Sequence, residues 1–348
     1  MQLRTKQLIS GSAAMMLSLS ALSVAAQASC ANKSSIGVSR TITIDAAGGK
    51  LYGGLQYTAG DLLRDGEFIL TFDDGPLRRY TRKVLAALKS HCTKASFFMV
   101  GRMAVADPAM VREVESAGHT IANHTWSHKN LQRRSARRAG GEIELGISAV
   151  RIAAQKPISP FFRFPYLADP KAMIAYGKSR DMAIFSIDID SNDYKTKSPG
   201  RVYSTIMSQV RSRRKGIMLF HDIQRSTAGA MQRILDTMQR EGFKIVHVVS
   251  KAPVGTIEEF DVQAQALHDK RRTVATAKAI GGGDYEKASR PRRTIRRTVV
   301  KSSDRKAIVS KAAAKRSNAF PSRTSAIAQP QIRPQPKADW RKNVWGNN

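Results

Sequence analysis

The 348-residue sequence is short of acidic residues, of cysteine and of aromatic residues. It has 27 Asp and Glu against 58 Lys and Arg, which gives a formal net charge of +31. Such an imbalance favours contact with something anionic, although solubility alone would also account for it. Aromatic residues make up 7% of the chain and are few in the basic C-terminal part, so little there could stack on bases. Only the charge suggests a nucleic-acid-binding protein, and we predict no specific nucleic-acid partner.

Only two cysteines are present, Cys30 and Cys92, which limits the chain to one internal disulfide. An oxidising compartment would allow that bond to form. The alternative is two unrelated thiols.

The sequence also lacks an unbroken apolar run suited to a stable membrane span. Its uncharged stretch at residues 8–28 contains many small and polar residues, follows Arg4 and Lys6, and ends in the small-x-small sequence AQA. This pattern is typical of a signal peptide, here residues 1–28, cleaved after Ala28. We therefore expect an exported protein, periplasmic or secreted; an uncleaved N-terminal anchor is the alternative.

What the sequence does contain is a regular alternation of strand and helix patterns from residue 66 to residue 250. Seven strands are predicted, at residues 67–72, 95–100, 119–123, 161–164, 182–189, 217–221 and 243–249. Helices are predicted at residues 82–88, 108–117, 135–154, 170–177, 202–210 and 230–240. This alternation predicts an α/β fold with a parallel sheet, and seven strands fit a distorted (β/α) barrel better than a small open sheet. The chemistry of such a fold lies at the carboxyl ends of its strands.

Two further segments flank this predicted domain. We interpret residues 29–65 as an N-terminal extension with one possible strand at residues 41–44. We interpret residues 251–348 as a basic, disordered tail, since apolar periodicity disappears after about Val262. Residues 262–348 hold 21 Lys and Arg against 5 Asp and Glu, a net charge of +16. This tail is expected to bind an anionic polymer of the cell envelope, or simply to be solvated.

Asp73 and Asp74 follow the first of these strands, in the sequence TFDDGP. A metal ion would relieve the repulsion between adjacent carboxylates, although an ordinary Asp-Gly turn contains the same residues. His124 and His128 follow the third strand and would share one face of a helix if the segment is helical. Two histidines and one aspartate would form a three-ligand site with an open position, as in catalytic zinc centres, whereas a histidine pair alone is more often incidental.

Three more polar residues lie at strand ends. Arg163 ends the fourth strand and could hold a carboxylate in its ionised form. Asp193 follows the fifth strand and could reach His221 at the end of the sixth. His221 has apolar neighbours, so a satisfied core histidine is the alternative.

Five segments at these strand ends resemble, in order, spacing and placement, the five motifs of the polysaccharide deacetylase family. The family is also known as the NodB-homology or carbohydrate esterase family 4 enzymes. The resemblance covers about residues 66–250, and the segments read TFDDGP, HTWSH, RFPY, DSNDY and LFH.

The resemblance implies a NodB-type barrel and a role for nine residues. These are Asp73 as general base, Asp74, His124 and His128 as metal ligands, Arg163 to orient Asp73, the backbone N–H of Tyr166 toward the oxyanion, His221 as general acid, Asp193 to tune His221, and Leu219 to line the acetyl pocket.

The implied reaction is removal of N-acetyl groups from a polymer or oligomer containing N-acetylglucosamine, with one divalent metal ion, zinc first and cobalt or nickel next. A chitin oligomer, peptidoglycan and an exported glucosamine polymer all remain open as substrates. A hydrolase of small amides with the same fold, and a non-catalytic sugar-binding module, are the alternatives. Two departures concern the sugar groove: Tyr194 stands where many members carry Trp, and Phe185 and Ile187 stand where a Trp often lies.

Overall fold

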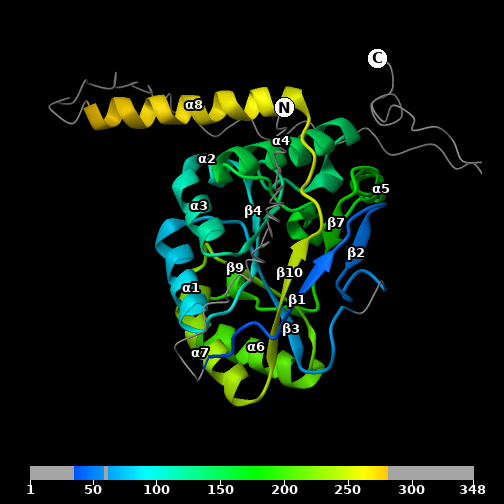
Figure 1. Ribbon diagram of the computed structural model, residues 1–348, viewed down its shortest axis with the longest axis vertical. Helices are drawn as coiled ribbons and strands as arrows, with labels where there is room; N and C mark the ends of the chain where they lie inside the picture. Colours follow the sequence, from blue (N-terminus) through cyan, green and yellow to red (C-terminus); the bar gives the residue numbers. More distant parts are fainter. Residues whose placement is uncertain (1–34, 59–61, 281–348) are drawn as a thin grey trace, which may run out of the picture.

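The computed structural model describes residues 35–58 and 62–280 (Figure 1). The predicted signal peptide, Cys30 and residues 281–348 of the predicted tail lie outside this part of the chain, so the Cys30–Cys92 disulfide remains a prediction. Among the helices of the described residues, none is both long and apolar enough to cross a membrane.

Ten strands of the described part form one sheet with parallel pairing. The main path runs through β1 (Arg40–Ile44), β10 (Lys244–Ser250), β3 (Glu67–Asp73), β4 (Ser96–Met99), β5 (Thr120–Asn123), β6 (Phe161–Phe162), β7 (Ala183–Phe185) and β2 (Lys50–Tyr52). β9 (Gly216–His221) pairs with β3 and with β8 (Ile189–Asp190). The predicted α/β fold with a parallel sheet is confirmed.

Helices join most successive strands and cover the sheet, as a parallel sheet requires. They are α1 (Arg78–Ser90), α2 (Gly101–Ala106), α3 (Pro108–Ser116), α4 (Ala136–Ala154), α5 (Lys171–Ser179), α6 (Pro199–Arg213), α7 (Arg225–Arg240) and α8 (Glu258–Ile280). Three short 3-10 helices are η1 (Leu131–Arg133), η2 (Pro165–Leu167) and η3 (Asp193–Lys195). Six of these helices were predicted; α2 and α8 were not.

The core lies between the sheet and its helices. Every residue of β3 is buried, as a strand covered on both faces requires. Phe72 of β3 stacks on Phe97 and Phe220 of the two neighbouring strands, with ring centroids 4.9 and 5.6 Å apart. This packing fixes the strands whose carboxyl ends carry the polar residues of the candidate site.

The single strand predicted at residues 182–189 is two strands, β7 and β8. Between them the chain leaves one neighbour and joins another, because the Ser186 N–H donates to the carbonyl of Tyr52 and the Asp188 N–H to that of Ile217. Continuous apolar sequence could not reveal this change of partner.

The boundary predicted at residue 66 does not separate an extension from the domain. β1 pairs along its whole length with β10, and β2 pairs with β7. The strand predicted at residues 41–44 is therefore real, but it and β2 belong to the main sheet.

The prediction of a disordered tail from residue 251 is wrong for residues 258–280, which form α8. Figure 1 shows α8 lying along α4 at one end of the molecule. Ala264 is fully buried and, with the half-buried Leu267, packs against Val105 of α2 and Ala149 of α4. Phe260, Ala264 and Leu267 are four and three residues apart, which is the spacing of one face of a helix. The many charged residues between and around them made this pattern hard to recognise.

Candidate metal and acid–base site

The pairing of β3 with β9 places two of the predicted site residues at one level of the sheet. Asp73 is the register partner of His221. β5 and β6, which precede two of the other predicted segments, pair at their carboxyl ends through Asn123 and Phe162. All five segments therefore meet at the carboxyl edge of the sheet, where parallel α/β folds place their sites.

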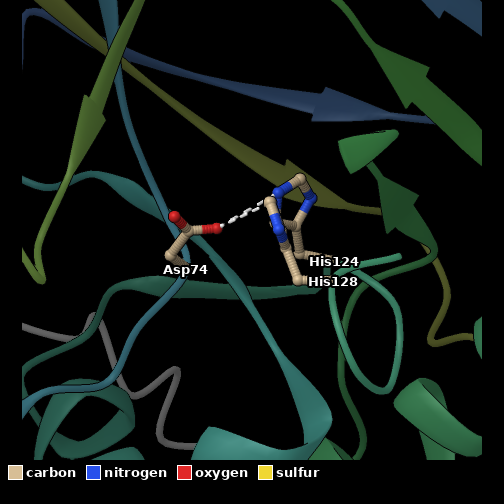
Figure 2. Close-up of side chains that lie close together, drawn as sticks. All are labelled: Asp74, His124 and His128. Carbon is tan, nitrogen blue, oxygen red and sulfur yellow. Dashed lines mark ion pairs between the residues drawn. The ribbon is translucent and has the colours of Figure 1, made fainter. Parts of the chain in front are cut away.

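Asp74, His124 and His128 point toward one another (Figure 2). Their nearest ligand atoms all lie within 4.8 Å of one another. The Oδ1 atom of Asp74 lies 3.1 Å from Nε2 of His128 and 3.5 Å from Nε2 of His124. The structure thus brings together all three residues that the sequence proposed as metal ligands.

A loop, not a helix, brings the two histidines together. Thr125 and His128 have φ angles of 68° and 57°, in the left-handed region. The His128 N–H donates to Oγ1 of Thr125 at 3.1 Å and closes the turn. The imidazole rings lie 5.0 Å apart. The one-face relation expected of a helix therefore does not apply, and the turn brings the rings together instead.

These residues fit a divalent cation. Oδ1 of Asp74 is buried and accepts no hydrogen bond from any described residue. Nδ1 of His124 lies 2.7 Å from the carbonyl oxygen of Arg163 and must donate to it, which turns the lone pair of Nε2 toward Asp74. Burial lowers the pKa of His124 to about 3, although the negative charge of Asp74 acts to raise it. The ring is therefore neutral. Neutral imidazoles and one carboxylate are the donor set of a catalytic zinc-type site.

Arg163 is the most heavily bonded side chain of the site and is fully buried. Its guanidinium donates to Oδ1 of Asp73 at 2.7 Å and to Oγ1 of Thr71 at 2.8 Å. It also donates to the carbonyls of Phe185 and Ser186 at 3.3 and 3.1 Å. A guanidinium held at four points fixes the orientation of the Asp73 carboxylate.

Asp73 is buried beside this cation. Burial raises the pKa of Asp73, and the positive charges of Arg163 and His221 act in the opposite direction. Its other oxygen, Oδ2, lies 3.7 Å from Nε2 of His124. Asp73 therefore has one oxygen fixed by Arg163 and one directed toward the predicted ligands, in a setting that makes it more basic than an exposed carboxylate.

Whereas His124 and His128 approach Oδ1 of Asp74, His221 approaches Oδ2. Its Nε2 is 4.0 Å from Oδ2 of Asp74, and its Nδ1 is 2.7 Å from Oδ1 of Asp193. Burial acts to lower the pKa of His221, but the hydrogen bond and charge of Asp193, with the charges of Asp74 and Asp73, raise it to about 9. The ring is therefore protonated at neutral pH.

Asp193 is held by groups that sequence reasoning missed. Its Oδ2 accepts the backbone N–H of His221 at 2.7 Å and the hydroxyl of Thr227. The Ser226 hydroxyl donates to the Asp193 carbonyl at 3.2 Å. Both hydroxyls come from the first turn of α7, and only their small polar character at that position could have indicated them.

The rim of the site carries two exposed tyrosines. Tyr166, in η2 with a φ of 61°, is 66% exposed, and its ring lies 4.7 Å from that of His128. Tyr194 is 51% exposed and meets the His221 ring edge-on at 5.7 Å. Phe185 and Ile187 are buried in the core and form no part of this rim.

Leu219 lies on β9 two residues before His221, so both side chains leave the same face of the strand. It is 6% exposed and sits opposite Thr71 and Asp190 in the sheet. It provides an apolar surface below the polar groups.

Asp222 is a buried carboxyl group that sequence reasoning also missed. Its Oδ2 accepts the Thr81 hydroxyl at 2.5 Å, and that hydroxyl in turn accepts the Leu77 N–H at 2.8 Å. Burial raises the pKa of Asp222 to about 7. A Cβ on Gly75 would lie 2.2 Å from Oδ1 of Asp222, so only glycine fits the turn that follows Asp74. Asp222 thus packs behind the turn that carries both aspartates.

A protein-family model described as polysaccharide deacetylase matches residues 63–184. A chitooligosaccharide deacetylase from Bradyrhizobium sp. (strain ANU 289) is 28% identical over 200 residues, which are 53% of this chain and 90% of that protein. Peptidoglycan-N-acetylglucosamine deacetylase PgdA from Listeria monocytogenes serotype 1/2a (strain 10403S) is 28% identical over 51% of this chain but only 37% of its own length.

Among solved structures, the Bdellovibrio bacteriovorus peptidoglycan deacetylase Bd3279 superposes with a TM-score of 0.56. It is 30% identical, and the match covers 62% of this chain and 59% of that one. This chain therefore spans nearly the whole of one relative and only part of the other two proteins.

Proposed function

Because the chain belongs to the polysaccharide deacetylase family, whose enzymes hydrolyse carbon–nitrogen bonds, we propose that it removes acetyl groups from N-acetylglucosamine units of a polysaccharide or oligosaccharide. The observation that carries the proposal is one cluster with three parts. A ligand set, Asp74 with two histidines, lies beside the carboxylate of Asp73, 3.7 Å from His124, and beside the protonated imidazole of His221, 4.0 Å from Asp74.

Asp73 is the general base of the proposed reaction. Its raised pKa and the fixed Arg163 contact leave Oδ2 ready to take a proton from the attacking water. A divalent cation bound by Asp74, His124 and His128 would supply Lewis-acid polarisation of the acetyl carbonyl.

His221 is the general acid. With a pKa of about 9 it carries a proton at neutral pH, which it gives to the leaving amine. Asp193 keeps the proton-bearing form stable and fixes the tautomer through Nδ1. Two titratable groups whose surroundings suit one to take a proton and the other to give one are the pattern expected of acid–base catalysis.

The remaining predicted residues shape the space for the acetyl group. We assign the backbone N–H of Tyr166 to the developing oxyanion, which such donors stabilise. We assign Leu219 to contact with the acetyl methyl, because it is apolar and faces the same side as His221.

The candidate substrates are the three that the sequence leaves open: chitin oligomers, peptidoglycan and exported glucosamine polymers. The relatives named above act on chitooligosaccharide and on peptidoglycan, so their names support both of the first two. We propose zinc as the metal, with cobalt and nickel as functional substitutes.

The test is acetate release from a chitin pentamer and from purified peptidoglycan. The protein is first stripped with a chelator and then reloaded with zinc, cobalt or nickel. The proposal expects loss on stripping and recovery on reloading. Full activity after exhaustive stripping would show that the reaction needs no metal. Binding of the glycan without acetate release would favour the sugar-binding alternative. Turnover only on small acetamides would favour the small-amide alternative.

The proposal extends to export and to the basic C-terminal residues. The pattern in residues 1–28 supports a periplasmic or secreted enzyme. The charge of +16 on residues 262–348 supports attachment to an anionic envelope polymer. Truncation after Ile280, which keeps α8 whole, should leave turnover on the pentamer unchanged and weaken binding to cell walls at low salt, since salt screens such contacts. The truncation removes residues 281–348, which hold 17 Lys and Arg against 4 Asp and Glu, a net charge of +13. Equal wall binding with and without residues 281–348 would exclude the attachment.

A further inference from the structure

A cavity lined by residues of α4, α8 and the metal-ligand loop combines apolar and basic side chains. Its volume is about 320 Å³, and we call it the α4–α8 pocket. Its lining includes three basic side chains, Lys129, Arg134 and Arg138, and two half-buried aromatic side chains, Trp126 and Phe260. A compact cavity with aromatic surface and a few charged groups is the usual form of a small-ligand site.

The pocket carries net positive charge. Among the described residues, no carboxylate forms an ion pair with Lys129, Arg134 or Arg138, whereas many other basic side chains of the described part do. The only acid in the lining is Glu142, whose two oxygens accept the N–H and the hydroxyl of Ser127 at 2.8 and 2.7 Å. Among the described residues, Arg134 and Arg138 thus have no carboxylate partner, and their charge favours binding of an anionic ligand.

The pocket is also tied to the metal site by short stretches of chain. Trp126 lies between His124 and His128, and Lys129 follows His128 directly, so its Cα is about 3.8 Å from that of a ligand. The backbone N–H of Trp126 donates to the backbone carbonyl of Glu142 at 2.7 Å, which attaches the ligand loop to α4. The pocket and the metal site therefore share one loop, residues 124–129.

We propose that the α4–α8 pocket binds an anionic substituent, carboxylate or phosphate, of the glycan whose N-acetylglucosamine is deacetylated. The proposal rests on the proposed function and narrows it to charged glycans. Arginine presents paired N–H donors that match either group, and aromatic surfaces suit the apolar faces of a sugar.

The test compares Arg134→Ala/Arg138→Ala with the unaltered enzyme on four substrates. These are a neutral N-acetylglucosamine oligomer, a glycan in which N-acetylglucosamine alternates with a carboxylate-bearing sugar, the methyl ester of that glycan, and a phosphorylated N-acetylglucosamine oligomer. Both arginines are exposed, so the double variant should fold. The matched control is Arg201→Ala/Arg213→Ala, which removes two exposed arginines from α6.

We expect the double variant to lose about tenfold to a hundredfold in kcat/KM on the anionic glycans, the range for one or two charge-assisted hydrogen bonds. Its activity on the neutral oligomer and on the ester should match that of the control. A loss on the carboxylated glycan alone assigns carboxylate, and a loss on the phosphorylated oligomer alone assigns phosphate. An equal loss on all four, or none on either anionic glycan, overturns the proposal.

Direct binding separates the pocket from the proposed function. If no substrate releases acetate, calorimetric titration of the same glycans into the unaltered and double-variant proteins still decides the question. Tighter binding of an anionic glycan than of the ester, lost in the double variant, supports the pocket even then. Equal affinities of the unaltered protein for the anionic glycan and for its methyl ester refute the proposed pocket.

Discussion

His124 and His221 are the same residue type, both at strand ends and both within 4.0 Å of Asp74, yet their proton affinities are opposite. His124 is buried and His221 half-buried. The pKa of His124 falls to about 3 through burial, and that of His221 rises to about 9. The difference lies in what each Nδ1 contacts. In His124 it faces the neutral carbonyl of Arg163, and in His221 it faces the carboxylate of Asp193.

The comparison teaches that the partner of the far nitrogen decides what an imidazole can do. A carbonyl fixes the tautomer without stabilising positive charge, so His124 is suited to a metal. A buried carboxylate stabilises the imidazolium, so His221 is suited to giving up a proton. A bound divalent cation would add positive charge near both rings and would move the pKa of His221 down from about 9.

His124→Ala should have the largest effect, because it removes a ligand. We expect loss of bound metal and a fall in turnover to the background rate. Metal content by elemental analysis and acetate release are measured on one preparation. Retention of a full equivalent of metal would show that His124 is not a ligand.

His221→Ala should spare the metal and still cost about 10²–10⁴-fold in kcat, the usual contribution of a general acid.

Asp73→Asn should also keep the metal and lose about as much kcat, because it removes the base and leaves the ligand Asp74 in place. If either variant lacks metal, the residue that it replaces belongs to the ligand set. If either variant turns over normally, the residue that it replaces does not have the proposed acid or base role.

Asp193→Asn should have a smaller effect and one that depends on pH. Without the carboxylate, burial dominates and the pKa of His221 drops. A general acid works only when protonated, so the alkaline limb of kcat, expected below pH 9 in the metal-loaded enzyme, should move to still lower pH. An alkaline limb that stays in place would show that another group sets it.

Thr227→Val should have the smallest effect. It removes one of the hydrogen bonds to Asp193 and leaves the carboxylate charge, so a loss of several-fold in kcat is expected, in line with about 1 kcal/mol for one such bond. The alkaline limb should not move toward lower pH as for Asp193→Asn, because the carboxylate that raises the pKa of His221 remains. A larger shift than that of Asp193→Asn would show that the charge of Asp193 is not the main cause of the raised pKa of His221.

The site was more predictable from sequence than the architecture around it. Asp73, Asp74 and the histidines could be selected because five polar segments at successive strand ends resemble, in order and spacing, the motifs of one family, although each segment alone has an ordinary structural explanation. Thr227 and Asp222 could not be selected, because a hydroxyl or a carboxyl gives no sign in the sequence of the partner it will meet. The change of partner between β7 and β8 was hidden for the same reason, since pairing is a long-range property.

α8 was missed because its apolar residues are small and few. Ala264 and Leu267 are separated by polar residues, and the high charge of the whole C-terminal part suggested disorder. Burial of Ala264 against α2 and α4 shows that a narrow apolar stripe suffices when a partner helix offers a matching surface.

The parallel pairing of β1 with β10 has a consequence for the order in which the molecule can assemble. Arg40 meets Val246 across more than 200 residues of chain, so β1 cannot find its partner until almost the whole domain has been synthesised. Contacts of such long sequence separation form late and slowly. Until then β1 has no neighbour at that edge, and the nascent chain cannot complete its sheet. A ribosome-bound chain that ends before Lys244 should therefore be open to proteases at β1, while the finished protein is closed there.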